Sequence, residues 1–223
     1  MSPADRVYPV GLVVAGRRCL VVGGGAVAAR KVAGLLDCGA SVTVVAPEVH
    51  DAIAALAARG TLAAISGDPL DVQLRPYRAG EAGGYRLVIA ATGDPAVDGA
   101  VHHDAEAAGV WVNSADDAAH CSALLPAVHR DGTVSVAVST GGASPALASW
   151  LRDRVAALLG PGLDQLALVL AEGRAAVLAE GRASSSVDWR GLLDGGLPEL
   201  VAEGRLEEAR AQVNAAIGAR GNQ

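Results

Sequence analysis

The fold of this chain is decided by one stretch, which reads Cys19-Leu20-Val21-Val22-Gly23-Gly24-Gly25-Ala26-Val27-Ala28-Ala29-Arg30-Lys31. An apolar run ends at three glycines, and an alanine-rich pattern with helical spacing follows at once. This order predicts a strand, a tight turn and the start of a helix, which is the arrangement that receives a pyrophosphate. Glycine allows the turn at Gly23 and a close approach of phosphate to the backbone at Gly25. The alternative is a turn that serves only helix–strand packing.

Apolar runs alternate with helical patterns through the first half of the chain. We expect strands at residues 18–22, 41–46, 61–66, 86–90 and 110–113, and helices at 27–38, 50–59 and 96–108. Residues 69–84 are rich in Pro and Gly and predict a surface connection. Near-continuous apolar strands that alternate with helices predict an α/β fold with a Rossmann-type, doubly wound parallel sheet.

The pattern changes after Asn113. We expect two strands at residues 123–129 and 133–139, joined by a turn at 130–132. A helix should begin at Pro145, capped by Ser144, and run to about Leu159. The residues that follow show helical spacing of leucine and valine, which predicts a helical carboxyl-terminal region.

Composition excludes several classes of function. The 223 residues carry a net charge of −6 without a basic block, so nucleic-acid binding is not expected. Three widely spaced cysteines indicate neither a disulfide framework nor a closed zinc site, and we expect no fixed metal site. We find no apolar signal core and no run of membrane-spanning length, and therefore expect a cytoplasmic protein without a membrane partner.

Ligands of a doubly wound sheet bind beyond the carboxyl ends of its strands. The second strand ends at Ala46, where an acid that binds the adenosine ribose is expected, and Glu48 is the nearest carboxylate. Thr92 follows the fourth strand, where it either meets the nicotinamide or ribose or belongs to a helix cap made by Asp94 and Pro95. These two interpretations of Thr92 remain open.

Asp116 and Asp117 follow the fifth strand, with His120 just beyond. A carboxylate there can take a proton from a substrate that loses a hydride, whereas the structural alternative is a turn or helix cap. A second glycine-containing loop, Ser139-Thr140-Gly141-Gly142, leads into the helix at Pro145. Its hydroxyl and N–H groups predict an anion-binding concavity, or else a cap without a ligand.

Together these segments resemble one family, the precorrin-2 dehydrogenase or sirohaem-synthase amino-terminal module, some members of which are also sirohydrochlorin ferrochelatases. The resemblance spans residues from about 8 to 160. It is carried by the following phrases, at the family's spacing: Tyr8-Pro9-Val10, residues 19–31, Val42–Pro47, Ile89–Pro95, Asn113 with Asp116, Cys121-Ser122 and Leu125–Ala127, and Val136–Pro145.

The resemblance implies an oxidoreductase that uses NAD to oxidise precorrin-2 to sirohydrochlorin in sirohaem or cobalamin biosynthesis. It places Asp116 as the general base, although Asp117 remains an alternative because the approach to the aspartate is less apolar here. It assigns the cofactor to the glycine turn of Gly23, Gly24 and Gly25, with the flanking residues Ala26, Val27, Pro47, Glu48 and Thr92. It places Ser139 in the tetrapyrrole cleft. We expect the adjoining Thr140, Gly141 and Gly142, and also His120, to bind the substrate.

The family further implies a homodimer, and for chelating members a lyase activity with Fe²⁺ or Co²⁺ as substrate. We therefore expect an NAD-binding domain at residues 1–116, a dimerisation and substrate-cleft segment at 117–160 and a helical domain at 161–223. Two alternatives remain open. One is an NAD(H)-binding redox sensor without catalysis, and the other is an enzyme that works mainly as a chelatase.

Overall fold

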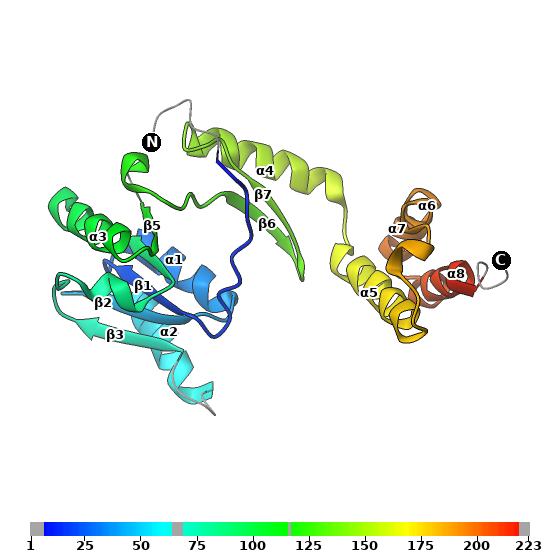
Figure 1. Ribbon diagram of the computed structural model, residues 1–223, viewed down its shortest axis with the longest axis horizontal. Coiled ribbons are helices and arrows are strands. Elements are labelled where there is room, and N and C mark those ends of the chain that lie inside the picture. Colours follow the sequence, from blue (N-terminus) through cyan, green and yellow to red (C-terminus); the bar gives the residue numbers. More distant parts are fainter. Residues whose placement is uncertain (1–6, 64–68, 116, 219–223) are drawn as a thin grey trace. The chain divides into compact units, whose positions relative to one another are not determined.

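The computed structural model describes residues 7–63, 69–115 and 117–218 (Figure 1). Its internal contacts divide the chain into two units. The first comprises Met1–Leu125 with Gly141–Ala143, and the second comprises Pro126–Thr140 with Ser144–Gln223. The expected division at residues 116 and 160 stays a prediction.

The first unit contains a five-stranded parallel sheet in the order β3-β2-β1-β4-β5. Its strands are β1 (Arg18–Val22), β2 (Ser41–Ala46), β3 (Leu70–Leu74), β4 (Leu87–Ala90) and β5 (Trp111–Ser114). The predicted doubly wound α/β class is therefore confirmed. Because the strands are parallel, the loops after β1, β2, β4 and β5 meet at one edge of the sheet.

Side chains alternate between the two faces of the sheet, and helices cover both. Val21 packs with α1 (Ala26–Asp37) and α2 (Asp51–Ala63), whereas Val22 packs with α3 (Pro95–Ala107) and the short helix η1 (Glu81–Gly84). Both valines are almost fully buried. Each such side chain stabilises the fold by about 1.5–3 kcal/mol relative to full exposure.

The prediction for the third strand was wrong. Residues 61–63 continue α2, residues 64–66 of the predicted span lie outside the described residues, and β3 begins at Leu70. β3 is an edge strand, and its Leu-Asp-Val-Gln-Leu sequence is not a continuous apolar run: Leu70 is buried, whereas Asp71 and Leu74 are exposed. It falls in the segment where we expected only a surface connection.

The second unit begins with an antiparallel hairpin of β6 (Ala127–Asp131) and β7 (Val134–Val138), against which α4 (Pro145–Leu159) packs. The hairpin was predicted, but β6 starts four residues later than expected. Asp131 pairs with Val134, so the turn is Gly132-Thr133. Ser144 caps α4 as expected, its hydroxyl accepting from the Leu147 N–H at 3.2 Å.

Four further α-helices build a separate core in the second unit: α5 (Leu163–Ala179), α6 (Trp189–Asp194), α7 (Leu197–Ala202) and α8 (Leu206–Gly218), with the short helix η3 (Ser184–Ser186) between α5 and α6 (Figure 1). Val177 and Leu197 are fully buried at its centre. Among the described residues, no single helix is long and apolar enough to cross a membrane. Only α4 and α5 taken together meet those two criteria, and they are bent by 65° at their break.

Candidate functional site

Two glycines of the turn after β1 are required by packing. Gly23 has φ +120°, and a Cβ there would overlap the Ala91 carbonyl at the end of β4. A Cβ on Gly24 would overlap the Glu48 carbonyl just after β2, and the Gly24 carbonyl itself accepts from the His50 N–H at 2.7 Å. These two residues therefore hold the turn against the neighbouring strand ends.

Gly25 differs, because a Cβ there would meet no atom within 4 Å. It is the N-cap of α1, with φ −76° and no side-chain cap, and no acidic residue lies in the first helical turn. The N–H groups of that turn are left for an anion, and the dipole of α1 favours negative charge at this position. Ala26 is exposed and Val27 is half-buried beside it.

The turn after β2 has no carboxylate at the position expected for ribose binding. Ala46 is only 3% exposed, whereas Pro47 and Glu48 are exposed. The Ala46 carbonyl accepts from the backbone N–H of Arg75 at 3.0 Å. The cationic residue Arg75 therefore lies directly after β3 and beside the end of β2.

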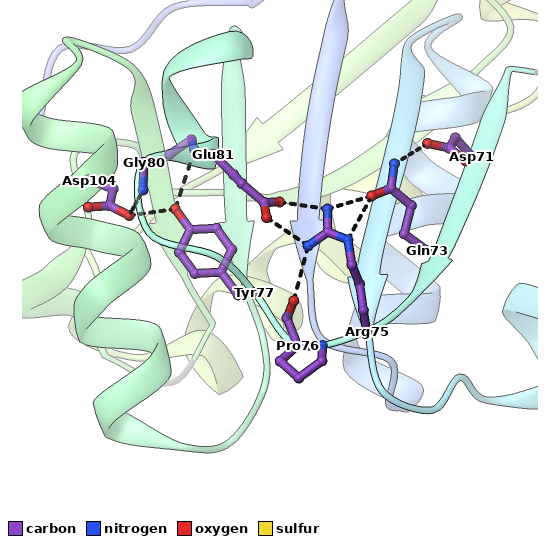
Figure 2. A network of polar contacts seen from close by, with 9 residues as sticks. Asp71, Gln73, Arg75, Pro76, Tyr77, Gly80, Glu81 and Asp104 are labelled. Atoms are coloured by element: carbon purple, nitrogen blue, oxygen red, sulfur yellow. Dashed lines mark hydrogen bonds and ion pairs between the residues drawn. The ribbon is translucent and has the colours of Figure 1, made fainter.

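The charged guanidinium of Arg75 is held by a local network of hydrogen bonds (Figure 2). Its guanidinium donates to both carboxylate oxygens of Glu81, at 2.7 and 2.9 Å, and to the Gln73 amide oxygen. The hydrogen bond to Glu81 is the main reason why the pKa of Arg75 is raised. Next to this network, the Tyr77 hydroxyl donates to Asp104 at 2.8 Å (Figure 2).

Thr92 belongs to a helix-capping network after β4. Its hydroxyl donates to the Asp98 carboxylate at 2.7 Å and accepts from the Asp94 N–H at 3.0 Å. Asp94 is the N-cap of α3 and accepts from the Ala96 N–H at 2.9 Å. The structure thus supplies a sufficient architectural role for Thr92, while a contact with a cofactor stays a prediction.

The segment after β5 is tied to the end of that strand. The buried Asn113 amide donates to the Ala123 carbonyl at 2.9 Å, and the Ser114 N–H donates to the Cys121 sulfur at 3.2 Å. Burial raises the pKa of the Cys121 thiol, which therefore stays protonated. Asp116, the expected base, lies outside the described residues.

Asp117 and His120 form a pair beyond β5. Asp117 caps the short helix η2 (Ala118–His120), accepting from the Ala119 N–H at 2.9 Å, and its other oxygen lies 2.6 Å from Nδ1 of His120. The hydrogen bond from His120, followed by that from Ala119, lowers the pKa of Asp117. The His102 ring on α3 meets the His120 ring edge-on, with 4.9 Å between their centroids. The sequence did not predict this contact between α3 and η2.

Lys31, the single lysine of the chain, is a second feature that we did not predict. Its side chain is half-buried on α1. Burial, followed by the nearby Arg30, lowers its pKa. The sequence signal was its position three residues after Ala28, on the margin of the helix face that packs on the sheet.

The two ends of the loop after β7, Thr140 and Ser144, belong to the second unit. Thr140 Oγ1 accepts from the Ser144 N–H and contacts the Ser144 carbonyl, both at 3.0 Å. Gly141 and Gly142 have φ +62° and +84°, so the loop needs glycine at both positions. Ser139 is exposed. The loop has the predicted turn-and-cap geometry, and its role toward a substrate stays a prediction.

No group of three or more His, Cys, Asp or Glu side chains that could hold a metal ion occurs within residues 7–63, 69–115 and 117–218.

Two family models match the chain. One, described as "Putative NAD(P)-binding", matches residues 10–127, and the other, described as "Sirohaem biosynthesis protein central", matches residues 131–158. A solved structure titled "SirC, precorrin-2 dehydrogenase" superposes with a TM-score of 0.70 at 27% identity, covering 93% of this chain and 99% of that one.

Curated relatives extend the similarity along almost the whole chain. The siroheme synthase of Nitrosococcus oceani is 37% identical over 94% of this chain, and that of Chromobacterium violaceum is 39% identical over 96%. The chain spans 43% and 44% of the length of these two relatives. Since the NAD(P)-binding model covers more than half of the sequence, the chain belongs to the NAD(P)-binding family of sirohaem biosynthesis proteins that its motifs resemble.

Proposed function

We propose that this chain is an NAD-dependent oxidoreductase that converts precorrin-2 to sirohydrochlorin in sirohaem or cobalamin biosynthesis. The observation that carries the proposal is the open N-terminus of α1 at Gly25, set beside the carboxyl ends of β2 and β4 in a family of sirohaem biosynthesis proteins. The structural likeness to a precorrin-2 dehydrogenase over 93% of the chain supports the same reaction.

The residues after β1 fit a dinucleotide. Gly23 and Gly24 fix the turn through their close approach to the Ala91 and Glu48 carbonyls, and Gly25 leaves room for phosphate at the N-terminus of α1, which no side chain caps. When bound, the nicotinamide accepts a hydride from the substrate. The chain's own contribution is to hold the pyrophosphate at this turn, with Ala26, Val27, Pro47, Glu48 and Thr92 around it.

The charges near the end of β2 favour NAD over NADP. The exposed Glu48 repels a 2′-phosphate, since like charges at close range raise the free energy of the complex. Arg75, which follows β3 beside Ala46, gives its guanidinium to Glu81 and Gln73 and so offers less positive charge to a phosphate. We therefore assign NAD as the cofactor.

Oxidation of precorrin-2 removes a hydride and a proton, so a base must act beside the nicotinamide. We assign this role to Asp116 from its position in the family motif, with Asp117 as the alternative. Of the two, Asp117 is tied to His120 and Ala119, which makes its carboxylate a weaker proton acceptor. Asp116 is therefore preferred.

The substrate is an acidic macrocycle, and we assign it to His120 and to the loop of Ser139, Thr140, Gly141 and Gly142. Glycine N–H groups in such a loop suit carboxylates. We also propose a cytoplasmic homodimer. The exposed apolar side chains of α4 support a contact between copies: Leu147 is 47%, Trp150 is 56% and Leu158 is 85% exposed in the single chain.

The test is an anaerobic absorbance assay with precorrin-2 and NAD. We expect the visible bands of sirohydrochlorin to appear as NADH forms. Asp116→Ala should abolish this signal while leaving NAD affinity nearly unchanged, and Asp37→Asn, on the exposed end of α1, should behave like the wild type. Unchanged turnover by Asp116→Ala would refute the base assignment.

The same preparation separates the alternatives. A redox sensor without catalysis would bind NADH but form no sirohydrochlorin. An enzyme that works mainly as a chelatase would accelerate insertion of Fe²⁺ or Co²⁺ into sirohydrochlorin above the spontaneous rate while failing to oxidise precorrin-2.

A further inference from the structure

The pair of Asp117 and His120 lies at the same edge of the sheet as the glycine turn. Successive hydrogen bonds connect the strand ends there, from the Ala91 N–H to the Val22 carbonyl at 2.8 Å and from the Ala115 N–H to the Ala90 carbonyl at 2.9 Å. The segment that carries η2 follows Ala115 directly. A side chain on η2 therefore starts from the same edge of the sheet as the glycine turn.

η2 is anchored at this edge. The Cys121 sulfur accepts from the Ser114 N–H at 3.2 Å, and it contacts the Ser114 and Asp117 carbonyls, each at 3.3 Å. The Ser122 hydroxyl accepts from the Val112 N–H at 3.0 Å. Because both ends of the turn are bonded, the orientation of His120 is set by the end of β5 and is not that of a free surface side chain.

The contact with Asp117 also fixes the tautomer of the ring. Nδ1 faces a carboxylate oxygen at 2.6 Å, so it carries the proton and donates it. Nε2 of the neutral ring then presents its lone pair as a proton acceptor. Asp117 is held as a carboxylate by this bond and by the Ala119 N–H, so it stabilises the ring when the ring gains a second proton. The ring of His102 on α3, a second titratable side chain, also contacts the His120 ring.

We propose that His120, positioned by Asp117, is a second catalytic residue of the dehydrogenation, which accepts from the base the proton that precorrin-2 loses and returns it to solvent. The proposal rests on the function proposed above. One C–H bond of the substrate breaks with its electron pair leaving as hydride to NAD, and a second bond to hydrogen breaks with its pair retained in the new double bond. That proton passes to the base assigned above and from the base to Nε2 of His120. The half-exposed ring, 48% accessible, then releases the proton to water.

The test compares His120→Ala with His103→Ala, which alters the exposed neighbouring histidine of α3. We expect His120→Ala to lower kcat at least about tenfold, within the range usual for loss of a proton-transfer group, and added imidazole to restore part of the rate. His103→Ala should match the wild type. Asp117→Asn should also lower kcat, because the amide no longer fixes the Nδ1–H tautomer.

The pH profile of kcat is a readout that would not change if His120 had a purely structural role. The pH profile of kcat should differ between the wild type and His120→Ala, because the variant lacks the ring that accepts the proton. Loss of activity without imidazole rescue and with an unchanged pH profile would overturn the inference, as would full activity of His120→Ala. A wild type that binds NAD but never oxidises precorrin-2 would instead overturn the proposed function, and this inference with it.

Discussion

The α-carbon of Gly23 packs directly on the carbonyl of Ala91, so the turn after β1 and the end of β4 leave no room for a side chain between them. Two residues further on, Gly25 faces open space. The same glycine-rich turn therefore contains one residue needed for folding and one that is available for a ligand.

This difference predicts opposite outcomes for two alanine substitutions. Gly23→Ala should destabilise the fold by at least about 3 kcal/mol, because φ is +120° and the new methyl group overlaps backbone. Gly25→Ala should cost only about 1 kcal/mol as a weakened N-cap, yet lower NAD affinity at least about tenfold by filling the space for phosphate. Urea unfolding and calorimetric NAD titration measure the two effects. Equal NAD affinity of Gly25→Ala and wild type would contradict the phosphate assignment.

The hydroxyl of Tyr77 predicts a stability effect away from the strand ends. It donates to Asp104 at 2.8 Å and accepts from the Ala82 N–H at 3.3 Å. Tyr77→Phe should destabilise the fold by about 1–2 kcal/mol, since the ring still packs but both hydrogen bonds are lost. Thermal unfolding checks this value, and Tyr8→Phe at an exposed tyrosine supplies the control.

The lowered pKa of Asp104 predicts how the stability that this contact contributes depends on pH. The Gly80 N–H, followed by the Tyr77 hydroxyl, lowers the pKa of Asp104 in the folded state. Its contribution to stability is therefore complete above the pKa of an unfolded aspartate and is lost as the pH falls through the lowered value. Asp104→Asn should flatten this acid limb in urea unfolding measured across pH. An unchanged acid limb would show that other carboxylates produce it.

The hairpin and α5 are joined by two reciprocal contacts. Asp131 accepts from the Leu163 N–H at 2.9 Å, and Asp164 accepts from the Thr133 N–H, also at 2.9 Å. Replacing either aspartate by alanine should cost about 1 kcal/mol, as for loss of a cap. Asp153→Ala, in a surface ion pair with Arg152, should change stability by less than about 0.5 kcal/mol. Equal effects of all three substitutions would argue against the reciprocal contacts.

Two helical glycines form a further matched pair. A methyl group added at Gly34 in α1 would meet no atom within 4 Å, so Gly34→Ala should stabilise the fold by about 0.5–1 kcal/mol through helix propensity. In α5, a Cβ on Gly173 would come within 2.5 Å of the Val213 side chain, so Gly173→Ala should destabilise the packing of α5 on α8. Chemical unfolding measures both. A stabilising Gly173→Ala would mean that Val213 moves aside freely.

The sequence predicted the parts of the fold in which local pattern and tertiary role agree. β1 and β2 lie at the expected residues because central parallel strands are buried on both faces, and after their exposed first residues both strands are buried and mostly apolar. β3 did not follow this pattern, since it is an edge strand with one partner strand and contains exposed and polar residues. A prediction based on continuous apolar runs therefore placed the third strand too early.

The candidate site likewise has some features that the sequence predicted and others that it did not. The roles of Gly23 and Gly25 follow from a local motif, whereas the contact of His120 with His102 joins residues 18 apart and depends on how η2 lies on α3. The half-buried state of Lys31 likewise depends on the segments of the fold that pack against α1. Such features follow from tertiary packing, which periodicity and spacing do not encode.

The most direct test of the central claim is the stoichiometry of the reaction in an anaerobic mixture of purified protein, precorrin-2 and NAD. We predict one NADH formed for each sirohydrochlorin, at a rate that depends on protein concentration and that Gly25→Ala slows. Sirohydrochlorin that forms at the same rate without NAD, or NAD that binds without any sirohydrochlorin appearing, would contradict the account.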